Sequence, residues 1–555
     1  MQISRESNLV SKYLPFSLAT ITIFVNTNIG ADPVNLPKLT LLVIASTYFL
    51  GLFVRPVANL FKTERFIFLI SSLYLFGLII SLILGKSNFL TNFYGAWARN
   101  TGFLTYLMLL IIFLIFASST DMRLFRNLLI FLYIAGLINI CYGLVFVLSG
   151  QDPIKWANRY GKFLSTLGNP DFASGFLGLA YAVGIYLAID KSRKLYFRIA
   201  SGILLPVFVF IIMKTGALQG LVLVAFSTGL FLLIWLFEKF RSKGLRITLL
   251  ASAVFGFLLS LLGTLQIGPL QHFLYKPSVS IRGAYWRAAI EMFKSSPIYG
   301  IGLDSYGDWY RRSRDAAALV LPGVDVTTDT AHNVFLDILA GGGLLLFIPY
   351  IALFIFVTFK GFENLKRNPK DPVAIGLLVT WLGYVAQSAI SINQIGLAIW
   401  GWALAGAIIG YSRLEINFVD VNKKIKKKSE PDTLKDSTVL VTFILFSIGL
   451  TTILPVQIAE AKWQTAVRSK NIQKILHAAD GWPRSCGRYL MTYNLFAGTT
   501  HTQQALSVIE KCRKINNNDF SSLILLEQFQ LSDESKIEIK NETHRLDPLN
   551  PKYKL

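Results

Sequence analysis

Long apolar stretches alternate with short charged loops over most of the chain, and this pattern predicts a membrane protein built from helices. A helix of about 20 apolar residues crosses the hydrocarbon core of a bilayer, and thirteen such stretches follow one another. They lie near residues 13–29, 39–58, 66–84, 102–118, 127–149, 172–189, 198–213, 217–237, 247–266, 333–359, 372–390, 394–412 and 437–457. The pattern predicts an all-α, polytopic membrane helix bundle and excludes a soluble multi-domain protein.

Two polar regions interrupt this pattern and define the predicted domain organisation. A stretch from about 267 to 331 separates the ninth span from the tenth, and a tail of helical composition follows residue 457. Helices are expected near 461–479 and 502–515, because 480–483 and 516–519 contain helix breakers. The closing segment 546–551 resembles the turn that ends a tetratricopeptide helix pair. We expect a membrane domain over 1–457, with a large loop over 267–331, and a small helical, tetratricopeptide-like domain over 458–555.

Basic residues in the short loops indicate the orientation, because positively charged loops stay on the cytoplasmic side of a membrane. Placing the N-terminus in the cytoplasm puts every strongly basic short loop on that side. These loops carry Lys62 and Arg65; Arg123 and Arg126; Lys191, Arg193, Lys194 and Arg198; Lys239, Arg241, Lys243 and Arg246; Lys360, Lys366, Arg367 and Lys370; and the basic run 423–428. The loops near 85–101 and 150–171, the loop 267–331 and the tail then face outward, so external chemistry is expected to use them.

Composition changes this picture little. Hydrophobic residues make up 53% of the chain and charged residues 15%, as a lipid environment requires. The net charge of +22 would suit nucleic acid, but a large share of it lies in the short loops. There it orients the helices and meets anionic lipid head groups. We therefore expect a lipid bilayer as a partner and no nucleic acid.

The three cysteines add one open question. Cys141 lies in a predicted span, whereas Cys486 and Cys512 both lie in the tail. The tail pair could form a disulfide in an oxidising compartment, and their spacing alone leaves this undecided. No cysteine–histidine cluster has the spacing of a zinc site.

The loop 267–331 carries the first candidates for chemistry, because ionisable groups next to a membrane span are expensive unless they have a function or a partner. Arg282 lies at the start of a predicted amphipathic helix, and Arg287 continues its basic face. Trp286, Met292 and Phe293 offer an apolar face suited to the membrane interface. In the alternative interpretation, the two arginines only reach lipid phosphates.

Two further motifs follow in the same loop. Gly300 and Gly302 either bring backbone amides within reach of a ligand or form an ordinary turn. His332 opens the next span, where an imidazole can act as a general base near neutral pH. Asn333 would orient this histidine or a substrate. The alternative for the His332–Asn333 pair is a polar helix start that water satisfies.

The order of these motifs, together with two others outside the loop, carries a family resemblance. Arg99 lies in an outer segment 94–102 before a span, and Asn169 lies in a Gly-Asn-Pro segment that opens another. With the Arg282 helix, the Gly300–Gly302 turn and His332, these segments resemble the O-antigen ligase and O-antigen polymerase family of bacterial envelope glycosyltransferases. Bacterial O-oligosaccharyltransferases belong to the same group. The resemblance covers about 40–412.

One segment departs from the family pattern. Many relatives carry Ser-Arg-Gly at the outer end of a middle span, and the matching segment here is 214–220. Lys214 supplies a comparable positive charge there, but Gln219 does not. We therefore expect Arg99 or Arg282 to contribute more to diphosphate binding than in those relatives.

The resemblance implies a GT-C-like membrane enzyme of the bacterial inner membrane and its reaction. An undecaprenyl-diphosphate-linked glycan would be the donor, and a hydroxyl of the lipid A core at the periplasmic face would be the acceptor. Arg282, with Arg99, Arg287 and Lys214, would bind the diphosphate, and His332 would deprotonate the acceptor. Trp286, Asn333, Gly300, Gly302 and Asn169 would shape the site. Neither a metal nor another cofactor is expected, because converging arginines neutralise the leaving diphosphate.

Two other functions remain open from the sequence. A polymerase that joins repeat units, or a transferase that glycosylates protein, would use the same donor site with a glycan or protein acceptor. A transporter for a small anion would use the arginines along a pathway. Transporters often contain repeats with broken helices in both halves, whereas the functional candidates here cluster on one face.

Overall fold

The computed structural model describes residues 2–27, 32–154, 158, 160–240, 242–414, 433–529 and 532–553. Over these residues the protein is all-helical, with 78% helix and no strands, which confirms the predicted polytopic helix bundle. A helix lies at each of the thirteen predicted spans. Ten of them are long and apolar enough to cross a membrane, while α5 and α16 are shorter apolar helices and α1 carries charged residues near its start. The basic run 423–428 and Arg241 lie outside the described residues.

These thirteen helices are α1 (Gln2–Ile23), α2 (Asn35–Thr63), α3 (Arg65–Leu84), α5 (Phe103–Ser118), α6 (Met122–Ser149), α7 (Pro170–Ile189), α8 (Leu195–Thr215), α9 (Gln219–Lys239), α10 (Lys243–Thr264), α15 (Val334–Arg367), α16 (Pro372–Ser388), α17 (Ile395–Ser412) and α19 (Thr433–Ser469). The loops between them add α4 (Phe89–Tyr94), α11 (Gln271–Leu274), α12 (Pro277–Ser295), α13 (Tyr306–Ser313) and α14 (Ala316–Ala318).

The chain divides into two compact units. The first, the bundle unit, comprises Met1–Phe76, Ala98–Gly229 and Ile348–Thr465. The second, the loop unit, comprises Gly77–Trp97, Leu230–Phe347 and Ala466–Leu555. The loop 267–331 and most of the C-terminal tail therefore belong to one unit.

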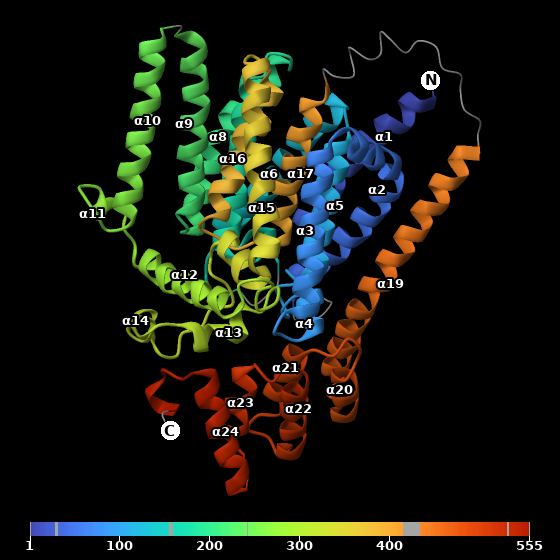
Figure 1. Cartoon of the computed structure of the whole chain (residues 1–555), viewed down its shortest axis with the longest axis vertical. Helices are drawn as coiled ribbons and strands as arrows, with labels where there is room; N and C mark the ends of the chain where they lie inside the picture. Colours follow the sequence, from blue (N-terminus) through green and yellow to red (C-terminus); the bar gives the residue numbers. More distant parts are fainter. Residues whose placement is uncertain are drawn as a thin grey trace. The chain divides into compact units, whose positions relative to one another are not determined.

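The centre of the bundle unit is α17, whose side chains are buried from Ile395 to Tyr411. It packs against α5, and α5 packs in turn against α2 (Figure 1). A Cβ atom on Gly406 would lie 2.3 Å from the carbonyl oxygen of Phe113 on α5. Small residues of this kind let the backbones of membrane helices approach closely. Glycine at this position therefore fixes how near α5 and α17 can lie.

A buried lysine of α2 binds the end of α1 in the same unit. The Lys38 ammonium donates hydrogen bonds of 2.6 and 2.8 Å to the carbonyl oxygens of Thr22 and Phe24 at the end of α1. Buried charges in membrane proteins commonly find such backbone carbonyl partners. Lys38 therefore has a structural role at the end of α1.

The loop unit is built around α12 and an interrupted α15. The residues of α12 that face inward, including Tyr285 and Met292, pack with residues of α13 and with Ile301 and Ala331 in one apolar core. The apolar face of α12 thus contacts protein, and the predicted contact of Met292 with the membrane interface is wrong. Trp286 packs against the margin of this core.

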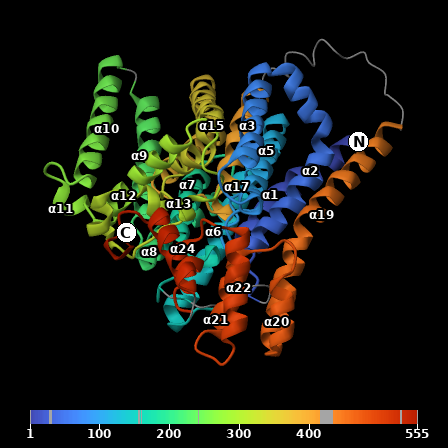
Figure 2. The same ribbon diagram turned by 60° about the horizontal axis from the view of Figure 1, so that its bottom comes forward.

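The tail forms a row of short helices: α20 (Ile472–Ala479), α21 (Cys486–Phe496), α22 (Thr502–Ile515), α23 (Phe520–Leu526) and α24 (Asp533–Leu546). Of these, α20, α21 and α22 lie side by side (Figure 2). The predicted helix 502–515 is confirmed at both ends. A disulfide joins Cys486 of α21 to Cys512 of α22, with their Cα atoms 4.6 Å apart, so the open question of their pairing is answered.

Candidate active site

The two residues predicted to carry the chemistry lie around one tyrosine. Arg282 and Tyr285 are three residues apart on α12, so they occupy the same face of the helix, one turn apart. The Tyr285 ring stacks on the His332 ring, with centroids 5.7 Å apart and planes inclined by 26°. Arg282 is half-buried, as is His332. We call Arg282, Tyr285, Asp329 and His332 the Tyr285 site.

The protonation state of Tyr285 depends on its burial and on two charged neighbours. Burial raises the pKa of the Tyr285 phenol, the nearby Arg282 guanidinium lowers it, and the Asp329 carboxylate raises it. The phenol therefore stays protonated and lies within the electrostatic reach of one cation and one anion. A phosphate bound by Arg282 would share this environment.

The backbone at His332 is strained. Its φ angle is +52°, a conformation that costs a non-glycine L-residue roughly 1–2 kcal/mol. Strain of this kind persists where the surrounding contacts determine it, and it is common at active sites. The His332 amide donates to the Thr330 hydroxyl at 3.3 Å, and the Ala331 amide donates to the Asp337 carboxylate at 2.7 Å. These bonds fix the histidine against Tyr285.

Asn333 is a helix cap in this structure. Its side-chain oxygen accepts a hydrogen bond of 3.1 Å from the Leu336 amide in the first turn of α15. Caps of this kind satisfy the donors that a helix leaves open at its start. The cap sets where α15 begins, as the simpler helix-start interpretation expects, and the site-shaping role of Asn333 stays a prediction.

A set of tyrosines supports Tyr285 from behind. The Tyr306 hydroxyl donates a hydrogen bond of 2.6 Å to the Tyr285 carbonyl oxygen. The Tyr310 ring meets the Tyr285 ring edge-on, with centroids 5.6 Å apart. Both supporting residues come from α13 and are buried. Helix α13 therefore holds the α12 turn that carries Tyr285.

The Gly300–Gly302 turn has a structural role. Its amides donate inside the protein, Gly300 to the Ser296 carbonyl and Gly302 to the Gly341 carbonyl, each at 3.0 Å. Both glycines have positive φ angles, and a Cβ atom on Gly300 would lie 2.2 Å from the Gly341 oxygen. These two amides therefore donate within the protein, as in an ordinary turn, and the expected role of the turn in shaping the site stays a prediction.

The same turn explains the interruption of α15. At Gly343 the backbone leaves helical geometry, with φ +61° and ψ −166°. The amides of Leu344 and Leu345 donate to the carbonyls of Pro297 and Ile298, at 2.8 and 3.1 Å. Backbone hydrogen bonds thus join segment 297–302 to α15 at its break. This pairing ties the end of α12 to the helix that begins directly after His332 and Asn333.

Arg287 lies outside the Tyr285 site. Its guanidinium forms an ion pair of 2.5 Å with Asp315, and both side chains are partly exposed. The pair lowers the pKa of the Asp315 carboxyl. Because Arg287 already has a carboxylate partner, diphosphate binding by this residue would require exchange of that partner.

The remaining predicted residues belong to the bundle unit. Lys214 is exposed near the end of α8, and its ammonium lies 5.3 Å from the centre of the Phe210 ring. Asn169 caps α7, because its side chain accepts a hydrogen bond of 2.8 Å from the Asp171 amide. Arg99 is half-buried directly after Ala98, whose carbonyl accepts a hydrogen bond of 2.7 Å from Asn35.

Two of the predicted motifs meet in the bundle unit. The Ser174 hydroxyl accepts a hydrogen bond of 2.8 Å from the Gly220 amide and donates one of 3.1 Å to the Ala217 carbonyl. The Gln219 side chain donates to the Asp171 carbonyl. The Gly-Asn-Pro segment and segment 214–220 are therefore adjacent. A shared diphosphate site between Arg99, Lys214 and Arg282 stays a prediction.

Three arginines of the loop that belong to no predicted motif bind the tail. Arg314 is buried and donates two hydrogen bonds, of 2.7 and 2.8 Å, to the Asp547 carboxylate. Arg311 donates to the same carboxylate at 2.9 Å, and Arg312 donates to the Asn518 side chain at 2.9 Å. We call Arg311, Arg312, Arg314, Asn518 and Asp547 the tail contact.

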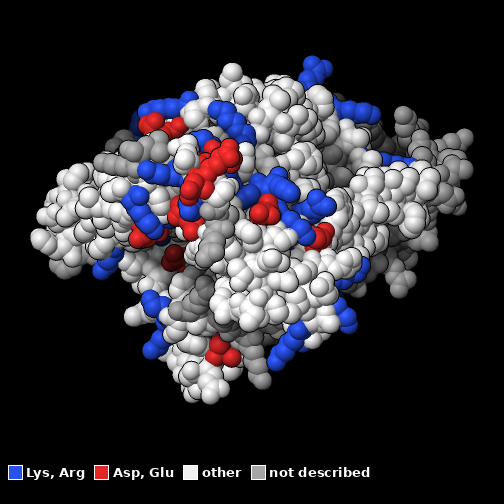
Figure 3. Space-filling model, turned by 90° about the horizontal axis from the view of Figure 1, so that it is seen from below, with Lys and Arg blue, Asp and Glu red and all other residues white. Residues whose placement is uncertain are grey.

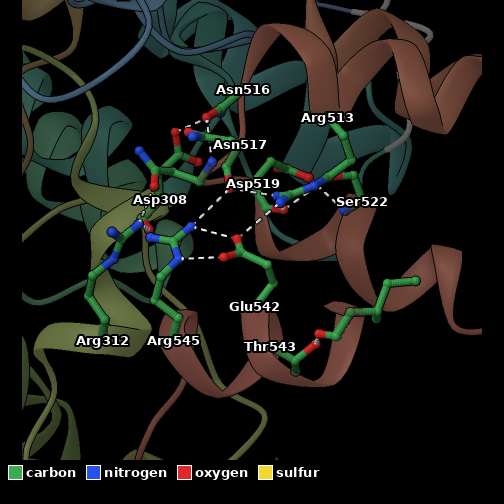
Figure 4. Close-up of polar contacts among 12 residues, drawn as sticks. Asp308, Arg312, Arg513, Asn516, Asn517, Asp519, Ser522, Glu542, Thr543 and Arg545 are labelled. Carbon is green, nitrogen blue, oxygen red and sulfur yellow. Dashed lines mark hydrogen bonds and ion pairs between the residues drawn. The ribbon is translucent and has the colours of Figure 1, made fainter. Parts of the chain in front are cut away.

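A second polar network connects Asp308 of α13 with residues of the tail (Figure 4). Asn516 donates a hydrogen bond of 2.8 Å to Asp308 of α13. Burial, together with the nearby Asp519 carboxylate, raises the pKa of Asp308 to about 6. Glu542 accepts from Arg545 at 2.8 Å and from Arg513 at 3.4 Å. Helix α13 is thus fixed from both sides, by Tyr285 and by the tail.

Charges of both signs are mixed on the surface that Figure 3 shows, where Lys and Arg side chains lie among Asp and Glu side chains. Within the described residues, the potential metal ligands that cluster are Cys486, Cys512 and Asp519. Both of these sulfurs belong to the disulfide. The expectation of a metal-independent reaction stays a prediction.

The chain is a polytopic helical membrane protein. Its folded loop places Arg282 and His332 around the Tyr285 ring. Residues 208–351 match the family model described as O-antigen ligase. This segment therefore resembles the O-antigen ligase domain of a family of membrane glycosyltransferases, and the resemblance predicted from the sequence is confirmed over these residues. The match includes α12, Gly300, Gly302 and His332. No curated protein matches the chain.

Proposed function

We propose that the protein is a glycosyltransferase that moves a glycan from undecaprenyl diphosphate to a hydroxyl of the lipid A core. The observation that carries this proposal is the Tyr285 site. Arg282 and His332 border one ring, inside the segment that matches the O-antigen ligase family. The reaction takes place at the periplasmic face of the bacterial inner membrane, with the N-terminus in the cytoplasm and the tail in the periplasm.

Arg282 binds the diphosphate and stabilises the leaving group. A guanidinium presents two parallel N–H donors to phosphate oxygens. Negative charge on the diphosphate increases as the glycosidic bond breaks, so a preorganised cation stabilises the transition state more than the ground state. The Tyr285 ring and the α13 tyrosines behind it support the helix that carries Arg282. Arg99 and Lys214 add further positive charge in this proposal.

His332 acts as the general base. A neutral imidazole takes the proton of the acceptor hydroxyl as its oxygen attacks the anomeric carbon, and the diphosphate leaves with the bonding electrons. The ring is held for this role by stacking on Tyr285 and by the strained backbone. No step of this reaction needs a metal ion or another cofactor.

The acceptor is the part of the proposal with alternatives of the same class. A polymerase would offer a growing glycan to the same donor site, and a protein O-oligosaccharyltransferase would offer a serine or threonine. The experiment therefore supplies all three acceptors at once to the purified protein in vesicles, with an undecaprenyl-diphosphate-linked glycan as donor. Mass spectrometry of the products is expected to find the glycan on the lipid A core.

The same assay tests the mechanism with variants. Arg282→Ala and His332→Ala are expected to insert into vesicles normally and to transfer almost no glycan. Lys294→Gln is the matched control, because Lys294 lies on the same helix, is exposed and pairs with Glu291 at 2.7 Å. Wild-type transfer rates in both Arg282→Ala and His332→Ala would rule out the mechanism. Solute flux without any transfer by the wild type would favour an anion transporter.

A further inference from the structure

A cavity in the bundle unit is lined by four cationic side chains from three segments. Its volume is about 460 Å³, within the range of roughly 300–1,000 Å³ typical of ligand sites. Lys12 comes from α1, Arg123 and Arg126 come from the start of α6, and Arg193 comes from the turn between α7 and α8. All four belong to segments that the charge pattern places on the cytoplasmic side.

Carboxylates balance only part of this charge. Arg193 pairs with Asp190 at 3.3 Å, and Arg123 lies 3.6 Å from Asp121. Asp190 also accepts two hydrogen bonds from Ser192, through its amide at 3.0 Å and its hydroxyl at 2.7 Å. Among the described side chains that line the cavity, the cations therefore outnumber these two acids.

Arg126 and Lys12 line the cavity without an ion-pair partner among the side chains that the structure describes. The Nε atom of Arg126 is buried and likewise has no hydrogen-bond partner there. Like charges at one cavity repel each other, so an anionic group in the cavity would lower the free energy of this arrangement.

A separate apolar groove also borders α1. The groove has a volume of about 560 Å³ and is lined by Tyr13, Phe16 and Ser17 of α1 together with residues of α2 and Phe446. The Phe16 ring contacts the ring of Phe131, with centroids 5.9 Å apart, and Phe131 lines the cationic cavity. This aromatic pair therefore links one residue of the groove with one residue of the cavity.

We propose that this composite site binds an anionic phospholipid, with the phosphate in the cationic cavity and an acyl chain in the groove. Guanidinium groups match phosphate oxygens in geometry and charge, and basic pockets between membrane helices on the cytoplasmic side suit anionic head groups. The groove explains why the phosphate belongs to a lipid, since inorganic phosphate would leave it unfilled. The site is independent of the proposed transferase reaction.

The test measures phosphatidylglycerol retained by the full-length protein after delipidation in detergent, by native mass spectrometry. Wild type is expected to retain phosphatidylglycerol in preference to neutral phosphatidylcholine. Arg126→Gln and Lys12→Gln are each expected to weaken retention roughly fivefold, as expected for one surface charge near anionic lipid. Lys191→Gln is the matched control, because this exposed lysine lies in the same turn as Arg193 and does not line the cavity.

A second arm separates the two sources of phosphate. Ser17→Phe fills the groove and leaves the four cations in place, so it should weaken phosphatidylglycerol retention and spare inorganic phosphate binding. Lys12 is exposed, so Lys12→Gln should fold even if Arg126→Gln does not. Unchanged retention in Lys12→Gln, or equal retention of phosphatidylcholine, would overturn the proposal. Displacement of the lipid by millimolar inorganic phosphate, with no effect of Ser17→Phe, would overturn the lipid assignment.

Discussion

Two groups of arginines in one loop have different surroundings. At the Tyr285 site, Arg282 is half-buried on α12, beside a tyrosine that stacks on a histidine. At the tail contact, Arg314 is fully buried and bound by both oxygens of Asp547. Arginine therefore has two different roles in this loop. Arg282 belongs to a proposed site, whereas Arg314 holds two chain segments together. An arginine that is buried together with a carboxylate partner therefore has a structural role.

The largest effect is expected from removing the carboxylate of the tail contact. Asp547→Asn leaves the buried Arg314 and its neighbour Arg311 without their shared anion. Breaking a buried pair in this way destabilises a protein by about 3–5 kcal/mol. Thermal unfolding of the full-length protein in detergent should show a lower midpoint, whereas Asp533→Asn, at an exposed carboxylate, should leave it unchanged. An unchanged midpoint in Asp547→Asn would contradict the structural role of these arginines.

Arg282→Ala should show the opposite behaviour. Loss of one preorganised charge that stabilises the transition state lowers kcat by roughly 10²- to 10³-fold. The unfolding midpoint should stay close to that of the wild type, because Arg282 is only half-buried. Initial transfer rates and unfolding curves of the same preparations check both statements. A variant that transfers normally but unfolds early would place Arg282 with the structural arginines.

Gly300→Ala tests the support that connects α12 to α15. The new Cβ atom would lie 2.2 Å from the Gly341 oxygen, at a residue with φ +74°. We expect a loss of roughly 2–4 kcal/mol in unfolding free energy, from overpacking and from the left-handed backbone. Gly283→Ala on α12 is the control, because its Cβ would meet only the end of Arg287 at 3.6 Å. Equal stability of both variants would contradict the close packing of the turn.

The smallest expected effect is a pH dependence at the second polar network of the tail. Burial and the charges of Asp519 and Asp304 raise the pKa of Asp308 to about 6, against the opposing effects of Asn516 and Arg312. The folded state thus holds the proton more tightly than the unfolded state. The resulting stabilisation is complete below about pH 4 and is lost as the pH rises through about 6.

Asp308→Asn should remove this contribution. The unfolding free energy of the wild type should fall by about 1–3 kcal/mol between pH 4.5 and pH 7.5 relative to that of the variant. Melting curves of both proteins across this range measure the difference. A wild type that gains stability relative to Asp308→Asn as the pH rises would show that the carboxyl is ionised in the folded protein.

Most of the fold follows from the sequence, because an apolar stretch long enough to cross a bilayer has few other ways to fold. The tail is predicted less well, since α21 and α23 are short and are held by packing and by the Cys486–Cys512 disulfide. Their residues carry little helical signal of their own, and a helix this short is stabilised mainly by tertiary contacts.

The site is predicted in part, for a similar reason. Arg282 and His332 are visible in the sequence because of their position beside predicted spans. Tyr285 was missed, although its spacing from Arg282 is one helical turn, and Asp329 gave no local signal. The partner of Arg314 lies 233 residues away along the chain, so no local pattern could separate this arginine from Arg282.

The most direct test of the central claim is the initial rate of glycan transfer by His332→Asn. Asparagine tolerates the left-handed backbone found at this position better than alanine does, so the fold should persist while the base is lost. We predict a rate lower than that of the wild type by roughly 10²- to 10⁴-fold at pH 7, with Lys294→Gln unchanged. A rate within a few-fold of the wild type would contradict the assignment of His332 as the general base.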